Sequence, residues 1–217
     1  AFLPLEEAAG ARSVNFVVPC AWHVDHGLVE EARARGHQIG VHGYDHSNRT
    51  PFAEAHERHQ RLDAARAFID RYEARGYRAP SLLRTRALLR DLSSRYAYDS
   101  SIPTSGGLFP VPNNGCATAR PFTVEGITEV PVSMPRDGSL RFLGHSPTEI
   151  AAIWRECAAQ IARARGVVML LTHCERRFSG TTAMLDAYQR TLAFLRESGG
   201  FTFCAASDVA AASREAA

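Results

Sequence analysis

Two histidines stand four residues apart, directly after a short apolar segment. His42 and His46 follow Gln38–Val41, which we predict to be a β-strand. This spacing lets one helical turn or a tight loop aim both imidazoles at one point. Two neutral imidazoles with one carboxylate make an open site for a divalent metal, zinc in the first place, with cobalt, nickel, manganese or iron as alternatives. The competing interpretation is a pair of surface histidines without a ligand.

Two further groups that could transfer protons lie later in the chain. His173 ends residues 166–172, the most hydrophobic predicted strand. Because the ordinary pKa of histidine lies near neutral pH, His173 is our candidate general acid, and a hydrogen-bonded histidine at a strand end is the alternative. Asp137 either tunes His173 as a carboxylate partner or is a turn residue. Asp99 lies within a predicted strand at residues 96–102, where it lines the pocket or forms a turn.

The segments that carry these residues alternate between predicted strands and predicted helices. We predict strands at residues 13–18, 38–41, 77–80, 96–102, 127–133, 166–172 and 201–204. We predict helices at residues 2–9, 27–35, 52–75, 82–95, 147–165 and 181–197, and a last one from residue 207. This alternation is typical of an α/β fold with a parallel sheet, in which polar residues after strand ends gather at one face. An eight-stranded barrel would need one more strand before residue 1.

Composition limits the classes of protein to which the chain can belong. Its 217 residues suit a single domain over 1–217, and a formal net charge of +2 gives no electrostatic case for binding nucleic acid. No segment has the length and hydrophobicity of a membrane span, and no signal peptide opens the chain. Five cysteines, odd in number and widely spaced, favour a reducing compartment such as the cytoplasm over a disulfide framework. The oligomeric state stays open, with a homo-oligomer among the alternatives.

The ordered set of motifs resembles the polysaccharide deacetylase (NodB-homology) family, which is family four of the carbohydrate esterases. GHQIGVHGYDH at residues 36–46 resembles the family's second motif, GHEIGxHxxxH, whose two histidines hold the metal. Arg78-Ala-Pro80 is similar to the third motif, which lines the site, and Leu170-Leu-Thr-His173 resembles the fifth. The resemblance covers essentially the whole chain and implies a distorted (β/α) barrel.

The resemblance also implies an activity. A member of this family would be a metal-dependent hydrolase that removes an N-acetyl or N-formyl group from an amino sugar in a polysaccharide, glycan or lipid-linked sugar. Arg78 would then orient a catalytic aspartate, and the alternative is an ordinary surface arginine. The candidate substrate-binding residues are Pro80 in the third motif, Met134 in the region of the fourth, and Asp99. Tyr44 is a further candidate, which either stacks on a sugar ring or packs in the core. Residues 130–135 and 200–204 also resemble the branch that deformylates formamido-arabinose on a lipid carrier.

Two departures from the family pattern matter. Residues 129–137 contain no tryptophan, which the fourth motif should carry, and the aspartate pair of the first motif is absent. Because the missing motif coincides with the missing first strand, we expect an N-terminally incomplete chain whose catalytic base and third metal ligand lie upstream of Ala1. Two alternatives remain. One is a barrel amidohydrolase that acts on a non-sugar amide or cyclic imide, and the other is a carbohydrate-binding barrel without catalysis.

Overall fold

The computed structural model describes residues 1–104 and 115–215, which fall into two compact units. The sheet unit comprises Ser13–Ile102, Pro121–Val130 and Ala205–Ala217. The helical unit comprises Ala1–Arg12, Pro103–Arg120 and Pro131–Cys204. The single domain inferred from the sequence stays a prediction. No helix among the described residues is both long and apolar enough to cross a membrane.

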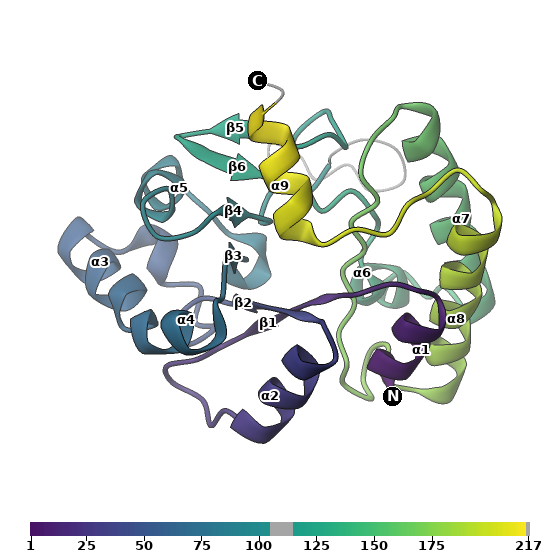
Figure 1. Cartoon of the computed structure of the whole chain (residues 1–217), viewed down its shortest axis with the longest axis horizontal. Helices are drawn as coiled ribbons and strands as arrows, with labels where there is room; N and C mark the ends of the chain where they lie inside the picture. The colour runs from purple at the N-terminus through teal and green to yellow at the C-terminus, as the bar shows by residue number, and fades with distance from the viewer. Residues whose placement is uncertain (105–114, 216–217) are drawn as a thin grey trace. The chain divides into compact units, whose positions relative to one another are not determined.

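The sheet unit contains six strands in its described part, in the order β1-β2-β3-β4-β6-β5 (Figure 1). They are β1 (Val14–Val17), β2 (Gln38–Val41), β3 (Gly76–Tyr77), β4 (Tyr98–Asp99), β5 (Phe122–Val124) and β6 (Ile127–Glu129). All neighbouring pairs are parallel except β5 with β6. The helices of this unit are α2 (His26–Ala34), α3 (Ala55–Asp63), α4 (Arg66–Tyr72), α5 (Arg86–Leu92) and α9 (Ala206–Glu215). The predicted alternation of strands and helices around a parallel sheet is confirmed here.

Two glycines on neighbouring strands make room for aromatic rings inside this unit. Gly40 and Gly76 are partners in the β2–β3 register. A Cβ on Gly40 would lie 2.6 Å from the Phe16 ring, and one on Gly76 would lie 2.3 Å from the Tyr98 ring. Real Cβ atoms do not approach other atoms this closely, so larger residues here would displace the rings that fill the interior.

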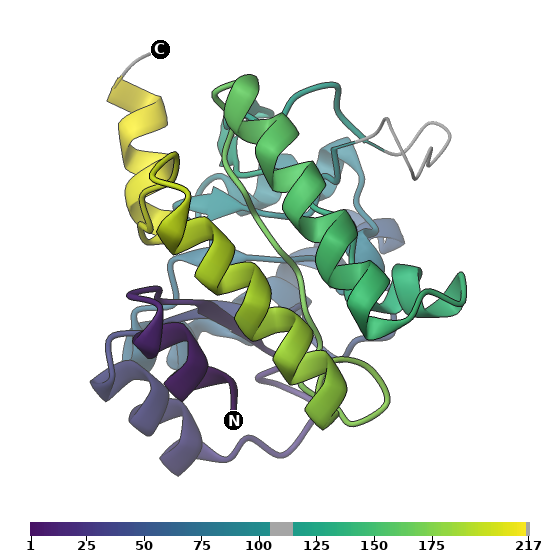
Figure 2. The same cartoon turned by 90° about the vertical axis from the view of Figure 1, so that its right-hand side faces the viewer.

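The helical unit is built around two long helices, α7 (Pro147–Arg163) and α8 (Thr182–Glu197), which lie side by side (Figure 2). Ser146 begins α7 with a capping box, because its side chain accepts from the backbone N–H of Glu149 and the Glu149 carboxylate accepts in return. The shorter helices are α1 (Phe2–Ala8) and α6 (Asp137–Phe142). The core of this unit includes the fully buried Leu140, Trp154 and Met184.

The strands predicted at residues 166–172 and 201–204 are wrong, because neither segment forms a strand in the described structure. Ser133 explains the first case. Its Oγ accepts from the N–H of Met169 at 2.8 Å and donates to the carbonyl of Val167 at 2.6 Å. The Ser133 hydroxyl therefore supplies two of the hydrogen bonds between these segments, and the backbone adds one from the N–H of Met134 to the carbonyl of Met169 at 3.3 Å. Pro131 and Pro135 have no N–H with which to extend this into a ladder.

Two predicted helices are shorter than expected. The helix predicted over residues 52–75 is divided into a 3-10 turn (Thr50–Phe52), α3 and α4. The one predicted over 82–95 begins only at Arg86, where the Thr85 hydroxyl accepts from the N–H of Leu88 at 3.2 Å. Ser81 and Leu82 have positive φ angles, which exclude them from an α-helix. The sequence did not predict β5 or α6.

Candidate functional site

The structure brings the predicted histidine pair together at the end of β2. The backbone N–H of His42 donates to the carbonyl of Val17 at 2.6 Å, and its ring Nδ1 donates to the carbonyl of Arg78 at 2.8 Å. Because a carbonyl can only accept, the proton sits on Nδ1 and the lone pair of the neutral ring on Nε2. His46 adopts a left-handed backbone with φ of 59°. The two ring centroids lie 5.0 Å apart.

A glycine shapes the turn between the two histidines. Gly43 has a φ of +72°, a conformation that other residues rarely adopt. A Cβ at this position would lie 2.7 Å from both Cγ and Cδ of Pro80. The ring of Pro80 therefore packs directly on the histidine turn, and it supports the loop whatever role it has toward a substrate.

We expect Gly43→Ala to lower the free energy of unfolding by about 3 kcal/mol, because it adds steric overlap to an unfavourable φ. Gly126→Ala is the matched control in the same unit. Gly126 has a similar φ of +83°, but its Cβ would make only an ordinary 3.6 Å contact with Ser93. Its expected loss is about 1 kcal/mol. Urea unfolding of both variants measures the difference, and equal losses would contradict the packing of Pro80 on this turn.

The residues between the histidines have other partners. Asp45 Oδ1 accepts from Arg61 Nη2 at 2.6 Å and from the backbone and hydroxyl of Ser47. Burial raises the pKa of Asp45, but these hydrogen bonds outweigh it and lower the pKa to about 2. The guanidinium of Arg61 also lies 4.5 Å from the centre of the Tyr44 ring. One face of Tyr44 is therefore covered, and its contact with a sugar stays a prediction.

The donor set fits a metal in part. His42 and His46 supply two imidazoles, and the Nδ1 hydrogen bond of His42 is the kind that orients metal-binding histidines. Within residues 1–104 and 115–215, no cluster of three or more histidine, cysteine or acidic side chains is arranged to hold a metal. A third ligand stays a prediction.

An exposed tryptophan that the sequence analysis missed lies beside this pair. Trp22 stacks on His46 with ring centroids 5.7 Å apart and an angle of 21°, and it is 58% exposed. It belongs to the loop between β1 and α2. The signal was available, because Trp22 follows a predicted strand end just as His42 does.

Arg78 is buried and holds its guanidinium on Ser100. Its Nε donates to the Ser100 carbonyl at 2.9 Å and its Nη2 donates to the Ser100 hydroxyl at 2.7 Å. The ring of Phe16 lies 4.3 Å from its Cζ. Burial lowers the pKa of Arg78 to about 10, so the side chain stays charged at neutral pH. Asp99 in this unit and Met134 in the helical unit are also buried, and their contact with a substrate stays a prediction.

In the helical unit the structure pairs His173 with Asp137. The buried carboxylate accepts at Oδ1 from His173 Nδ1 and at Oδ2 from the backbone N–H of His173, both at 2.7 Å. It also accepts from Gly138 N–H and the Ser179 hydroxyl at 2.7 Å. Burial raises the pKa of Asp137, but hydrogen bonds from His173 and Ser179 outweigh it and lower the value. The hydrogen bond to Asp137 in turn raises the pKa of His173.

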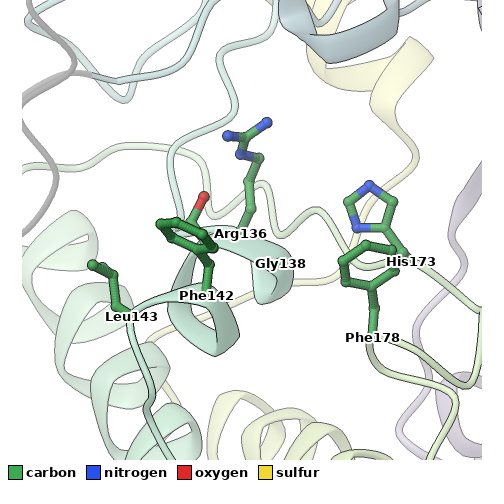
Figure 3. Close-up of a pocket in the computed structure, with 7 residues that line it drawn as sticks. Arg136, Gly138, Phe142, Leu143, His173 and Phe178 are labelled. Carbon is green, nitrogen blue, oxygen red and sulfur yellow. The ribbon is translucent and has the colours of Figure 1, made fainter.

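This pairing leaves Nε2 of His173 as the atom that can exchange a proton with a ligand. The side chain is 39% exposed and opens into a pocket of about 520 Å³ (Figure 3). The Phe178 ring lies 4.8 Å from the His173 ring, and Phe142 and Leu143 lie on the pocket's other side. Arg136 adds a positive charge to a mostly apolar lining. The sequence analysis named none of these four neighbours as pocket residues.

Comparison with known proteins begins with the sequence. A family model described as polysaccharide deacetylase matches residues 1–99, which include both histidines of the turn and Arg78 but neither Asp137 nor His173. No curated protein matches the sequence. The resemblance to the formamido-arabinose branch therefore stays a prediction.

Solved structures match over nearly the whole chain. A Mycobacterium smegmatis protein assigned to the polysaccharide deacetylases has a TM-score of 0.73 at 18% identity, covering 99% of this chain and 76% of its own. Puue allantoinase has a TM-score of 0.68 at 20% identity, covering 96% of this chain and 69% of its own. A family 4 carbohydrate esterase from Streptomyces lividans, in complex with acetate, has a TM-score of 0.55 at 15% identity, covering 94% of this chain and 82% of its own. The chain therefore has the α/β fold of the polysaccharide deacetylase structures, as the sequence predicted.

Proposed function

We propose that this protein is a metal-dependent hydrolase that removes the N-acyl group of an amino sugar, releasing a free amine and a carboxylate. One observation carries the proposal. His42 and His46 lie together after a parallel strand, with the Nδ1 of His42 fixed on a backbone carbonyl. The match of the polysaccharide deacetylase model to the residues around this pair supports the same reaction.

His42 and His46 would hold the metal, with zinc as the first choice. When bound, a divalent metal supplies Lewis acidity toward the acyl carbonyl and toward the attacking water. The protein's own contribution is orientation, because the Arg78 carbonyl keeps the His42 lone pair on Nε2. Amide hydrolysis also needs a proton for the departing amine. We assign it to Nε2 of His173, whose imidazolium the buried Asp137 carboxylate stabilises.

We assign Trp22 the role of a platform on which a sugar ring stacks. Stacking that covers about 60 Å² of apolar surface contributes about 1.5 kcal/mol. Trp22→Ala should therefore raise KM for a chitooligosaccharide about tenfold with little change in kcat, and Trp22→Phe should recover part of the loss. Fluorescence gives a second measurement, because the other tryptophan, Trp154, is fully buried. An unchanged KM together with unchanged emission on adding the oligosaccharide would remove Trp22 from the site.

The proposed reaction is tested by incubating the zinc-loaded protein with N-acetylated chitooligosaccharides and with N-formylated amino sugars. Release of acetate or formate in equal amounts with free amine is the expected result. A second candidate is hydrolysis of a cyclic amide, which the structural similarity to Puue allantoinase favours. Allantoin given to the same preparation distinguishes the two, because ring opening without sugar deacylation would replace the first proposal by the second.

A further inference from the structure

Two carboxyl groups that the proposed reaction does not use lie buried together on β4 and β6. Asp99 and Glu129 are partners in the register of these parallel strands, and both are 0% exposed. Two charges cannot be held this close in the interior. Burial raises the pKa of both carboxyl groups, and the charge of Asp99 raises that of Glu129 further, well above its ordinary value. The pair therefore keeps one proton, which we place on Glu129.

The proton accounts for an otherwise unpaired atom. If both carboxyl groups were ionised, Glu129 Oε2 would have no hydrogen-bond partner among the residues that the structure describes. As a protonated acid it donates to the neighbouring Asp99 carboxylate. The other oxygen of Glu129, Oε1, accepts from the backbone N–H of Ile102 at 2.8 Å. The pair is therefore fully satisfied with one shared proton.

Asp99 connects this pair to the segment that contains Arg78. Its carboxylate accepts from the Ser101 hydroxyl at 2.6 Å and from the Ser101 backbone N–H at 3.2 Å. Because the Ser101 hydroxyl donates its proton to Asp99, its oxygen is available as an acceptor, and it accepts from the N–H of Ala79 at 2.8 Å. The direction of each hydrogen bond along this path is set by the negative charge of Asp99.

The path ends at the metal-site histidine. Ser100, which lies between Asp99 and Ser101 in the chain, accepts from the Arg78 guanidinium with its carbonyl and its hydroxyl. The carbonyl of Arg78 accepts from Nδ1 of His42. A hydrogen-bonded path therefore runs from β6 through β4 and the segment after β3 to the imidazole after β2.

We propose that Asp99 and Glu129 are positioning residues for His42, a proton-sharing pair that fixes the Arg78–Ala79 segment and so the orientation of the imidazole. The inference rests on the proposed function only in that His42 is taken as a metal ligand. In this role Asp99 acts from the interior through its hydrogen bonds, whereas the sequence analysis offered a pocket-lining role or a turn role.

Two conservative substitutions distinguish a role in positioning His42 from a purely structural role of the buried pair. In Glu129→Gln the amide N–H₂ can donate to Asp99 while Oε1 still accepts from Ile102, so zinc affinity should stay within about threefold of wild type. In Asp99→Asn one carboxylate oxygen is replaced by an N–H₂ group, which cannot accept a hydrogen bond. That group must face either the two donors of Ser101 or the proton of Glu129. We expect zinc binding to weaken about 10–100-fold, the usual effect of losing an outer-shell partner. Asp70→Asn, an exposed acid of α4, is the matched control.

Two measurements give the answer. Zinc dissociation constants come from competition with a chromophoric chelator, and ¹⁵N NMR of the metal-free protein gives the tautomer of His42, assigned with His42→Ala. The Nδ1–H tautomer should persist in wild type and Glu129→Gln and be partly lost in Asp99→Asn. If Asp99→Asn does not fold, Ser101→Ala takes its place, with an expected loss of about tenfold in zinc affinity.

Wild-type zinc affinity and tautomer in Asp99→Asn, or in Ser101→Ala where that variant replaces it, would overturn the inference. So would an equal loss of affinity in Glu129→Gln. Failure of the wild type to bind zinc would count against the proposed function instead. The tautomer comparison would then still decide whether the carboxyl pair positions His42.

Discussion

Replacing His42 with alanine is expected to abolish stoichiometric zinc binding and to lower kcat/KM for an N-acetylated chitooligosaccharide more than about 100-fold. Loss of an outer-shell partner commonly weakens a metal site about 10–100-fold, so loss of a direct ligand should exceed that range. The variant also removes the hydrogen bond to the Arg78 carbonyl. That loss should lower the free energy of unfolding by about 1 kcal/mol, too little to unfold the protein.

Metal content measured by mass spectrometry, together with kcat/KM before and after addition of zinc, tests this prediction. His56→Ala is the control, because His56 is an exposed histidine of α3 outside the site. It should keep wild-type metal content and activity. A His42→Ala protein that retained wild-type zinc would show that the metal binds elsewhere, and the proposed function would lose its main support.

The sequence was sufficient for the part of the site that is local. His42 and His46 lie within one turn of each other, so their spacing alone predicted that the rings would meet. Arg78 was identified by its resemblance to the third motif, and His173 by its place after a predicted strand that does not form in the described structure. The hydrogen bond from His42 to the Arg78 carbonyl joins residues 36 positions apart and involves a backbone atom. No side-chain pattern encodes such a contact.

Other features lay outside the reach of sequence patterns for different reasons. Acidic residues are usually exposed, so nothing in the sequence indicated that Asp99 and Glu129 would both be buried. The strand predicted over residues 166–172 failed because Ser133 bonds there through its hydroxyl, which hydrophobicity does not report. Trp22 was overlooked because the family pattern places its tryptophan in a later motif.

The second large effect is expected for Asp137→Asn. The buried Asp137 carboxylate accepts four hydrogen bonds, and both of its oxygens are used. The N–H₂ group of an asparagine would therefore have to face at least one of these donors. The expected loss is about 1–3 kcal/mol in the free energy of unfolding. Activity should fall by about 10²–10⁴-fold, the usual contribution of a positioned acid or base, because His173 loses the partner that holds its proton.

The pH dependence provides a sharper test than the size of the loss. Asp137 raises the pKa of His173 above 6.5, so the imidazolium persists at a higher pH in the folded protein than in the unfolded chain. The contribution of the His173 imidazolium to stability is fully present below pH 6.5 and is lost as the pH rises through the raised pKa of His173. The pKa of Asp137 is lowered from 3.8, so its contribution is present above that pH and is lost as the pH falls through the folded value.

In Asp137→Asn the alkaline limb of kcat/KM should therefore move to lower pH, and the unfolding free energy should lose its decline above pH 6.5. Asp186→Asn is the control, because it removes only an exposed ion pair with Arg190 on α8 and should leave the alkaline limb and the decline of stability above pH 6.5 in place. Urea unfolding and kcat/KM measured across the pH range follow the two effects separately. A lower stability with an unmoved alkaline limb would make Asp137 a structural residue only, since a carboxylate that tunes the general acid must change the pH at which that acid loses its proton.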